Sequence, residues 1–174
     1  MLLDISPLAE PNLKDSKIVS KLLRYEGTGR AIVEFDKHKS KLSDYAYWFM
    51  LSTLWVSYTG FSDLKLWKKL FSSNRAHRKH SIMKPSEVIT YDELPDRLTV
   101  FRAKRPNESD CIAYTLDVNV AIQWALRREV DTIHCYTVAK ADVLALFLRR
   151  NESEVIVLEQ TSLDFIECIT VISE

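Results

Sequence analysis

The residues best suited to chemistry lie in three segments of the second half of the chain. Val100-Phe101-Arg102-Ala103 ends a β-prone run in an arginine, and Ala113-Tyr114-Thr115-Leu116-Asp117 leads from a short strand into a helix. The third segment carries Glu152 and Glu154, followed by the aliphatic run Val155-Ile156-Val157. Residues i and i+2 of an extended segment point the same way, about 6.5–7 Å apart. Both carboxylates can therefore face one site.

The order and spacing of these segments resemble the arginine-serine-glutamate class of ADP-ribosyltransferases. In that family a first strand ends in arginine, a second strand bears a Ser/Thr motif and leads into a helix, and a later strand begins with the catalytic glutamate. Glu152-Ser153-Glu154-Val155-Ile156-Val157 looks like the E-x-E pattern of the arginine-specific members. The resemblance covers residues 98–174, and the first 95 residues show no match to this family.

The resemblance implies a domain that takes NAD as substrate and transfers ADP-ribose to arginine side chains of a protein target, with release of nicotinamide. Glu154 is then expected to hold the ribose 2′-hydroxyl and to stabilise the positive charge that develops on the ribose. Arg102 is expected to bind the pyrophosphate, because a guanidinium fork suits this dianion better than a lysine does. Glu152 is expected to orient the acceptor arginine.

Three further residues complete the predicted NAD site. They are the backbone of Ala103, the ring of Tyr114 and the hydroxyl of Thr115, although an aromatic residue at a position such as 114 is more often part of the core. The sequence departs from the family at Ala113, where the motif has its first serine, and at Ala103, where a glycine is common. Two alternatives therefore stay open: an NAD glycohydrolase, and a catalytically silent binding or inhibitor protein with the same fold.

The elements expected around these residues are strands and helices in mixed order. After Pro95 the pattern predicts short strands over Leu98–Arg102, Cys111–Thr115, Thr132–Val138, Glu154–Leu158 and Phe165–Ile172, and helices over Asp117–Arg128 and Lys140–Phe147. The first 95 residues carry helical periodicity, with helix starts at Asp15, Ser43, Ser62 and Pro85. We predict an α+β protein, with a helical region over residues 1–95 and a split β-sheet ADP-ribosyltransferase-like domain over residues 96–174.

Composition limits the remaining classes of function. Apolar residues make up 47% of the 174, which favours a folded core, and the formal net charge is zero, which excludes a global basic field for nucleic acid. The three cysteines form no C-x-x-C pair, and no glycine-rich phosphate loop occurs. We expect no metal site. Without a signal peptide or a long apolar run, we expect a cytoplasmic protein that does not enter membranes.

One short basic run, Arg75-Ala76-His77-Arg78-Lys79-His80, allows a local partner surface. A solvated helix end is the favoured interpretation, and a patch for RNA or for an acidic partner is the alternative. The resemblance itself implies a protein target, in the manner of phage- or toxin-type effectors of this family.

Overall fold

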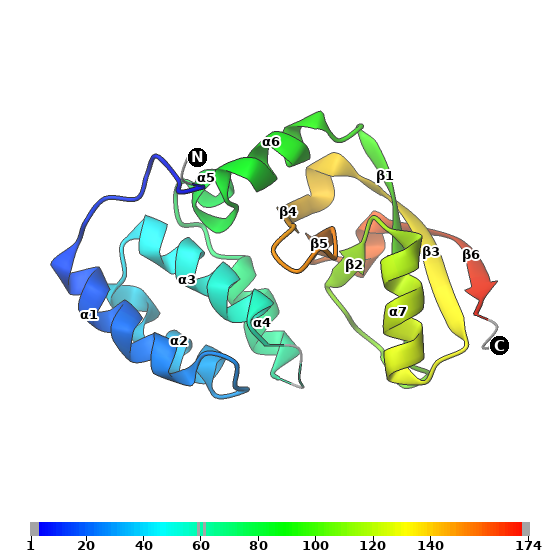
Figure 1. Ribbon diagram of the computed structural model, residues 1–174, viewed down its shortest axis with the longest axis horizontal. Coiled ribbons are helices and arrows are strands. Elements are labelled where there is room, and N and C mark those ends of the chain that lie inside the picture. The colour runs from blue at the N-terminus through cyan, green and yellow to red at the C-terminus, as the bar shows by residue number, and fades with distance from the viewer. Residues whose placement is uncertain (1–3, 59, 61, 172–174) are drawn as a thin grey trace. The chain divides into compact units, whose positions relative to one another are not determined.

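The computed structural model describes residues 4–58, 60 and 62–171. The chain divides between Ile89 and Thr90 into two compact units, the first made of helices and the second built on a β-sheet (Figure 1). The protein is therefore α+β, with the helices preceding the strands, as the sequence predicts. Within the described ranges, no helix has both the length and the apolar character that crossing a membrane requires.

The first unit consists of short helices. Their bounds are α1 (Leu13–Leu22), α2 (Ala31–His38), α3 (Asp44–Val56), α4 (Leu64–Phe71), α5 (Arg78–Ile82) and α6 (Pro85–Glu93), with 3₁₀ turns at Leu23–Tyr25 and Lys39–Lys41. The division between the units falls inside α6. Sequence reasoning predicted α1, α3, α4 and α6 but missed α2 and α5.

Polar side chains set most of these helix starts by accepting free backbone N–H groups. Ser43 caps α3 as predicted. The caps of α1 and α4 are Asn12 and Asp63, so the predicted caps Asp15 and Ser62 were wrong. Asp15 instead accepts a 3.0 Å hydrogen bond from the backbone N–H of Ser43, which ties α1 to the start of α3.

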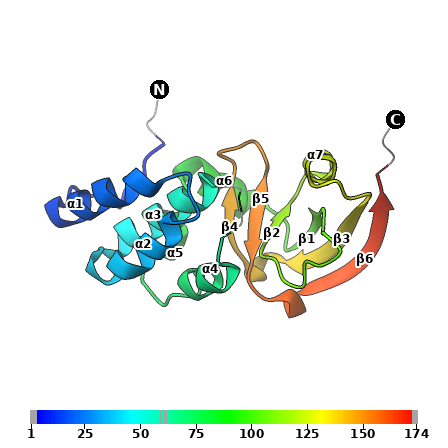
Figure 2. The ribbon, with the colours of Figure 1, turned by 90° about the horizontal axis from the view of Figure 1, so that it is seen from below.

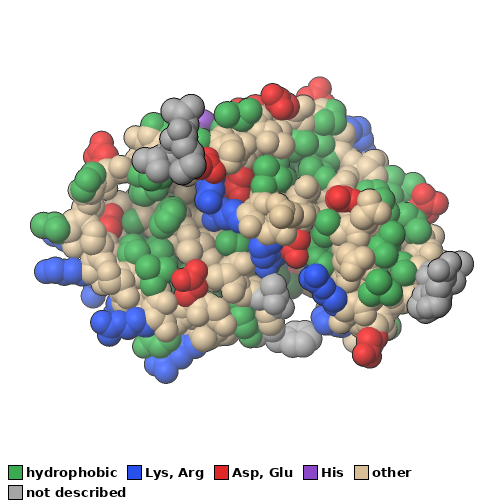
Figure 3. Space-filling model, in the orientation of Figure 1, with side chains coloured by type: hydrophobic (Ala, Val, Ile, Leu, Met, Phe, Trp, Pro, Cys, Tyr) green, Lys and Arg blue, Asp and Glu red, His purple; other side chains and the backbone are tan. Residues whose placement is uncertain are grey.

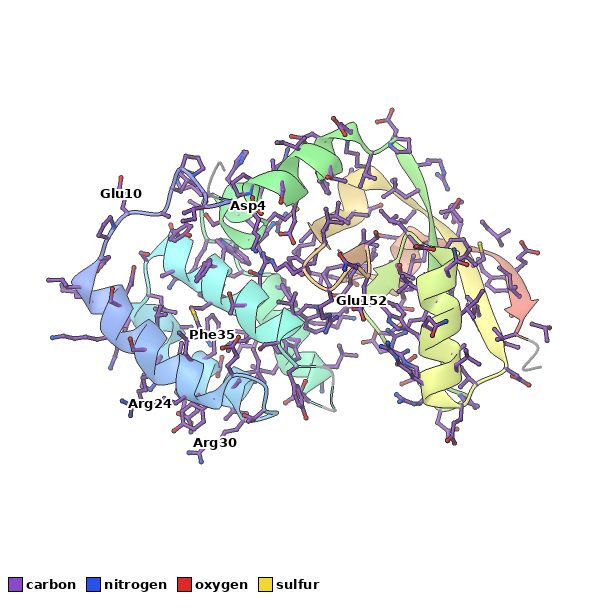
Figure 4. The ribbon with its side chains drawn as sticks, in the orientation of Figure 1. Asp4, Glu10, Arg24, Arg30, Phe35 and Glu152 are labelled. Atoms are coloured by element: carbon purple, nitrogen blue, oxygen red, sulfur yellow. The ribbon has the colours of Figure 1, made fainter. Side chains whose placement is uncertain are left out.

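The core of the first unit forms around α3. Tyr47 and Trp48 are buried with Phe35 of α2, which Figure 4 labels, and the Phe35 and Tyr47 rings lie 5.1 Å apart. Burying each such side chain contributes about 1.5–3 kcal/mol. Tyr47 and Trp48 of α3 are thus core residues.

The second unit is a six-stranded sheet in the order β4-β5-β2-β1-β3-β6 (Figure 2). Its strands are β1 (Arg97–Arg102), β2 (Ala113–Thr115), β3 (Thr132–Ala139), β4 (Val143–Phe147), β5 (Glu154–Val157) and β6 (Leu163–Thr170). All neighbouring strands pair antiparallel. The predicted last residue of the final strand, Ile172, lies outside the described residues.

Two triplets of strands meet at a weak join in this sheet. The halves β4-β5-β2 and β1-β3-β6 connect through β1 and β2, whose register contains the single pair Phe101↔Thr115. Helix α7 (Val118–Arg128) lies over one face near this join (Figures 1 and 2). It buries Ala121, Trp124 and Ala125 against Ala103 and other residues of the sheet.

One predicted helix is a strand. Lys140–Phe147 was expected to be helical, but Lys140–Asp142 forms a 3₁₀ turn and Val143–Phe147 forms β4. Most of β4 is buried, so its apolar residues follow one another without alternation. Such a short apolar run has the same pattern in a buried strand as in a buried helix.

Candidate functional site

The two glutamates of the predicted site lie where a tight loop enters β5. In that loop Asn151 and Ser153 both adopt left-handed backbone, with φ of 55° and 43°. Left-handed backbone costs a residue other than glycine about 1–2 kcal/mol, and such strain gathers at functional sites. These turns place Glu152, labelled in Figure 4, ahead of the strand and Glu154 at its first position.

Glu154 is a buried carboxylate at the centre of the β4-β5-β2 triplet. Its register partners are Thr115 on β2 and Phe147 on β4, and the residue is only 3% exposed. Its Oε2 accepts a 2.7 Å hydrogen bond from Nη2 of Arg150. A carboxylate removed from water to this degree needs such a partner to stay ionised.

Glu152 shares the same guanidinium. Its Oε2 lies 2.7 Å from Nη2 of Arg150, although this oxygen has no partner that meets hydrogen-bond geometry, so the contact is one of charge. Its Oε1 accepts a 3.3 Å hydrogen bond from the indole N–H of Trp124 on α7. Two carboxylates and one guanidinium leave one net negative charge here.

Thr115 holds this loop in place. Its buried hydroxyl donates a 2.6 Å hydrogen bond to the main-chain carbonyl of Glu152 and accepts one of 3.0 Å from the backbone N–H of Asp117. Leu116 adds a backbone bond of 3.1 Å to the carbonyl of Ser153. Thr115 was predicted to contact NAD, and its observed contacts position Glu152.

Arg102 lies at the end of β1, and its guanidinium is hydrogen-bonded within the protein. Its Nε and Nη2 donate to the carboxylate of Glu108, and its Nη1 donates a 3.0 Å hydrogen bond to the carbonyl of Ala113. Phe101, the preceding residue, pairs with Thr115. Because successive strand residues face opposite sides, Arg102 points to the face away from Thr115.

The site residues therefore form two groups. Thr115 pairs with Glu154 in the sheet and holds Glu152 through its carbonyl, so these three come together. Arg102 makes its hydrogen bonds to Glu108 and Ala113 instead. That Arg102 joins the glutamates around one substrate stays a prediction.

Tyr114 and Ala103 are both core residues. The Tyr114 hydroxyl accepts a 2.8 Å hydrogen bond from Gln160 and lies 3.1 Å from Sγ of Cys111. Burial raises the pKa of Tyr114 above its usual value, and its ring packs edge-on against Tyr136. Ala103 is fully buried under α7. These contacts favour the core interpretation of Tyr114 over stacking on a nucleotide.

Arg128 is a charged residue of this region that sequence reasoning missed. It lies in the last turn of α7, donates a 2.6 Å hydrogen bond to the carbonyl of Ala103, and stands over the Trp124 ring. Burial, and next the positive charge of Arg102, lower the pKa of Arg128 to about 10. A basic residue in the last turn of a helix is common and carried no specific signal.

A hollow is lined by residues that follow β1 and by residues between α7 and β3. Its volume is about 480 Å³, and its lining residues are Lys104, Arg105, Pro106, Glu129, Val130, Asp131, Thr132 and His134. The lining contains cations and carboxylates in equal number, and it includes neither glutamate of the loop nor Arg102. The charges that line the hollow therefore do not by themselves indicate a binding site for a nucleotide.

The basic run of the first unit is partly structural. Arg75 donates hydrogen bonds to the carbonyls of Leu42 and Lys39 and to Asp44, and it lies over the Tyr47 ring. Arg78 of the same run is exposed, as are basic residues on α1 and just after it: Lys14, Lys17, Lys21 and Arg24. Figure 3 shows several basic side chains at its lower left. No group of three metal-binding side chains occurs among the residues that the structure describes.

Comparison with known proteins found no match: no protein-family model, no curated protein and no solved structure is similar to this chain. The case for any function therefore rests on the contacts of the site itself.

Proposed function

We propose that the protein is an NAD-dependent mono-ADP-ribosyltransferase that modifies arginine side chains of a protein target and releases nicotinamide. One observation carries this proposal. A guanidinium, that of Arg150, lies between the carboxylates of Glu152 and Glu154, with its Nη2 at 2.7 Å from each. The loop before β5 thus has the shape and charge to bind an arginine side chain.

The two carboxylates suit different reactants. Glu154 is the more buried and is fixed within the sheet, so its charge is preorganised for a positive charge that develops beside it. On a ribose, a bond to the 2′-hydroxyl brings that charge close to the carbon losing nicotinamide. Glu152 precedes the strand and can hold the guanidinium of an acceptor in line with this carbon.

The reaction balances without a further reagent. The bond between C1′ of the ribose and the nicotinamide nitrogen breaks, and its electron pair leaves with neutral nicotinamide. A new bond forms between C1′ and a guanidinium nitrogen of the acceptor, which releases one proton. The product guanidinium keeps its positive charge, so it can still pair with Glu152 until it dissociates.

NAD binding requires Arg102 to change partners. Its side chain is 9% exposed and its guanidinium is held by Glu108, so a pyrophosphate must replace that carboxylate to reach it. Both are anionic oxygen ligands that a guanidinium fork binds in the same bidentate way. Arg102 takes the role assigned to it only if Glu108 is displaced and its side chain also leaves the sheet face away from Thr115 and Glu154.

The same contact favours one alternative from another class. If Glu108 keeps Arg102, the domain binds no pyrophosphate, and Ala113 supplies no hydroxyl at the start of β2. The chain would then be a catalytically silent binding or inhibitor protein built on this fold. NAD hydrolysis is a third outcome, in which water takes the place of the acceptor guanidine.

A direct assay separates these functions. The full chain is incubated with NAD and agmatine, a small primary guanidine, and the products are identified by mass spectrometry. ADP-ribosyl-agmatine together with nicotinamide supports the proposal. Nicotinamide with free ADP-ribose alone identifies a glycohydrolase, and unchanged NAD identifies the silent protein.

A further inference from the structure

We propose that Arg150 is itself an acceptor, so that the protein ADP-ribosylates its own Arg150 in an intramolecular reaction that then blocks the site. This inference rests on the proposed function and extends it to a modification site. The guanidinium of Arg150 already occupies the position between Glu152 and Glu154 where an acceptor arginine is expected.

The backbone of the loop keeps Arg150 at this position. Asn151 and Ser153 are both left-handed, and the Asn151 N–H bonds the carbonyl of Leu148 at 3.0 Å, closing a turn around Arg150. The side chain of Arg150 is 26% exposed, so the guanidinium is accessible from solvent while one nitrogen contacts the carboxylates. The acceptor is thus attached to the site that would modify it.

Entry of NAD also changes the contacts of Arg150. The ribose 2′-hydroxyl needs Glu154, and Arg150 then retains Glu152, the carboxylate assigned to acceptor arginines. A tethered, oriented reactant has an effective concentration far above that of any free protein, on the order of 10⁵ M or more in favourable intramolecular reactions. Arg150 therefore competes with external arginines for the same ribose carbon.

The intramolecular step makes and breaks the same kinds of bond as transfer to a target. A guanidinium nitrogen of Arg150 bonds to C1′ of the ribose, the C1′–nicotinamide bond breaks, and nicotinamide leaves with the electron pair. One proton is lost, and Glu152, the carboxylate that Arg150 retains, accepts it before passing it to water. The attached ADP-ribose then fills the space that the next NAD requires, so one modification silences one molecule.

The test uses the full chain with isotope-labelled NAD, followed by proteolysis and mass spectrometry. We expect the label on the peptide containing Arg150, at a rate constant that does not change when the protein is diluted. Arg150→Lys keeps a cation beside both carboxylates and should lose this label. Arg149→Lys is the matched control, because Arg149 stands over the Phe147 ring and should leave the labelling intact.

A second measurement distinguishes a failure of this inference from a failure of the proposed function. Agmatine is added to the wild-type protein and to Arg150→Lys, and thermal unfolding confirms that both are folded. If ADP-ribosyl-agmatine forms while Arg150 stays unlabelled, the inference is wrong and the proposed function stands. If neither agmatine nor Arg150 is modified by any of these proteins, both proposals fail together.

Discussion

The hydroxyl of Thr115 donates a 2.6 Å hydrogen bond to the main-chain carbonyl of Glu152, thirty-seven positions further along the chain. This bond connects the end of β2 to the loop that leads into β5. Thr115, which is expected to contact NAD, thus also holds the loop that carries Glu152 against β2. Several expectations about variants depend on this relationship.

Thr115→Val should separate positioning from folding. The change removes the hydroxyl and leaves the buried carbonyl of Glu152 and the N–H of Asp117 without their partner, which costs about 1–3 kcal/mol of unfolding free energy. Transfer to agmatine should fall further than NAD hydrolysis, because Glu152 orients only the acceptor. Thr115→Ser restores the hydroxyl and should recover transfer. Equal loss of both activities in Thr115→Val would show that the bond serves stability alone.

Glu108→Gln should increase the affinity for NAD. The substitution keeps the size of the side chain but weakens its hold on the Arg102 guanidinium, which a pyrophosphate must take over. A hydrogen bond to a charged group is worth about 1.5–3 kcal/mol, so Arg102→Ala should weaken NAD binding by about that amount. Calorimetric titration with NAD measures both variants. Unchanged affinity in both would remove Arg102 from the substrate site.

His134 should make the protein less stable in mild acid. Burial, and next the positive charge of Lys104, lower the pKa of His134 below its ordinary value of 6.5. The unfolded chain therefore binds a proton at a pH where the folded protein does not, so stability rises with pH through this window and falls as the pH drops below about 6.5. Urea unfolding at several pH values tests this effect. His134→Gln should flatten the dependence, and an identical slope in the variant would assign it to other groups.

Much of the fold follows from local patterns in the sequence. The alternation of apolar and polar residues located β1 and β3, and the Asp117 cap located the start of α7. Helix α2 was missed because Gly29 and the short Ala31–His38 run give little periodic signal before a 3₁₀ turn. The buried β4 was mistaken for a helix because its pattern lacks alternation.

The site could be predicted only in part. The family resemblance grouped Glu152, Glu154 and Thr115, and the pairing of β2 with β5 brings these residues together. The partners of Arg102 could not be predicted, because Glu108 lies in an irregular connection whose path no periodicity determines. The central position of Arg150 also depends on two left-handed residues, and neither is a glycine that would have indicated them.

The division of labour between the two glutamates is the most direct test of the proposed function. Nicotinamide release and transfer to agmatine are measured together for wild type, Glu152→Gln and Glu154→Gln, after each variant has been shown to be folded. Glu154→Gln should reduce both activities by about 10²–10⁴-fold, the scale of losing a preorganised charge. Glu152→Gln should abolish transfer and retain part of the release. Nicotinamide release that Glu154→Gln leaves unchanged would contradict the assignment of this site.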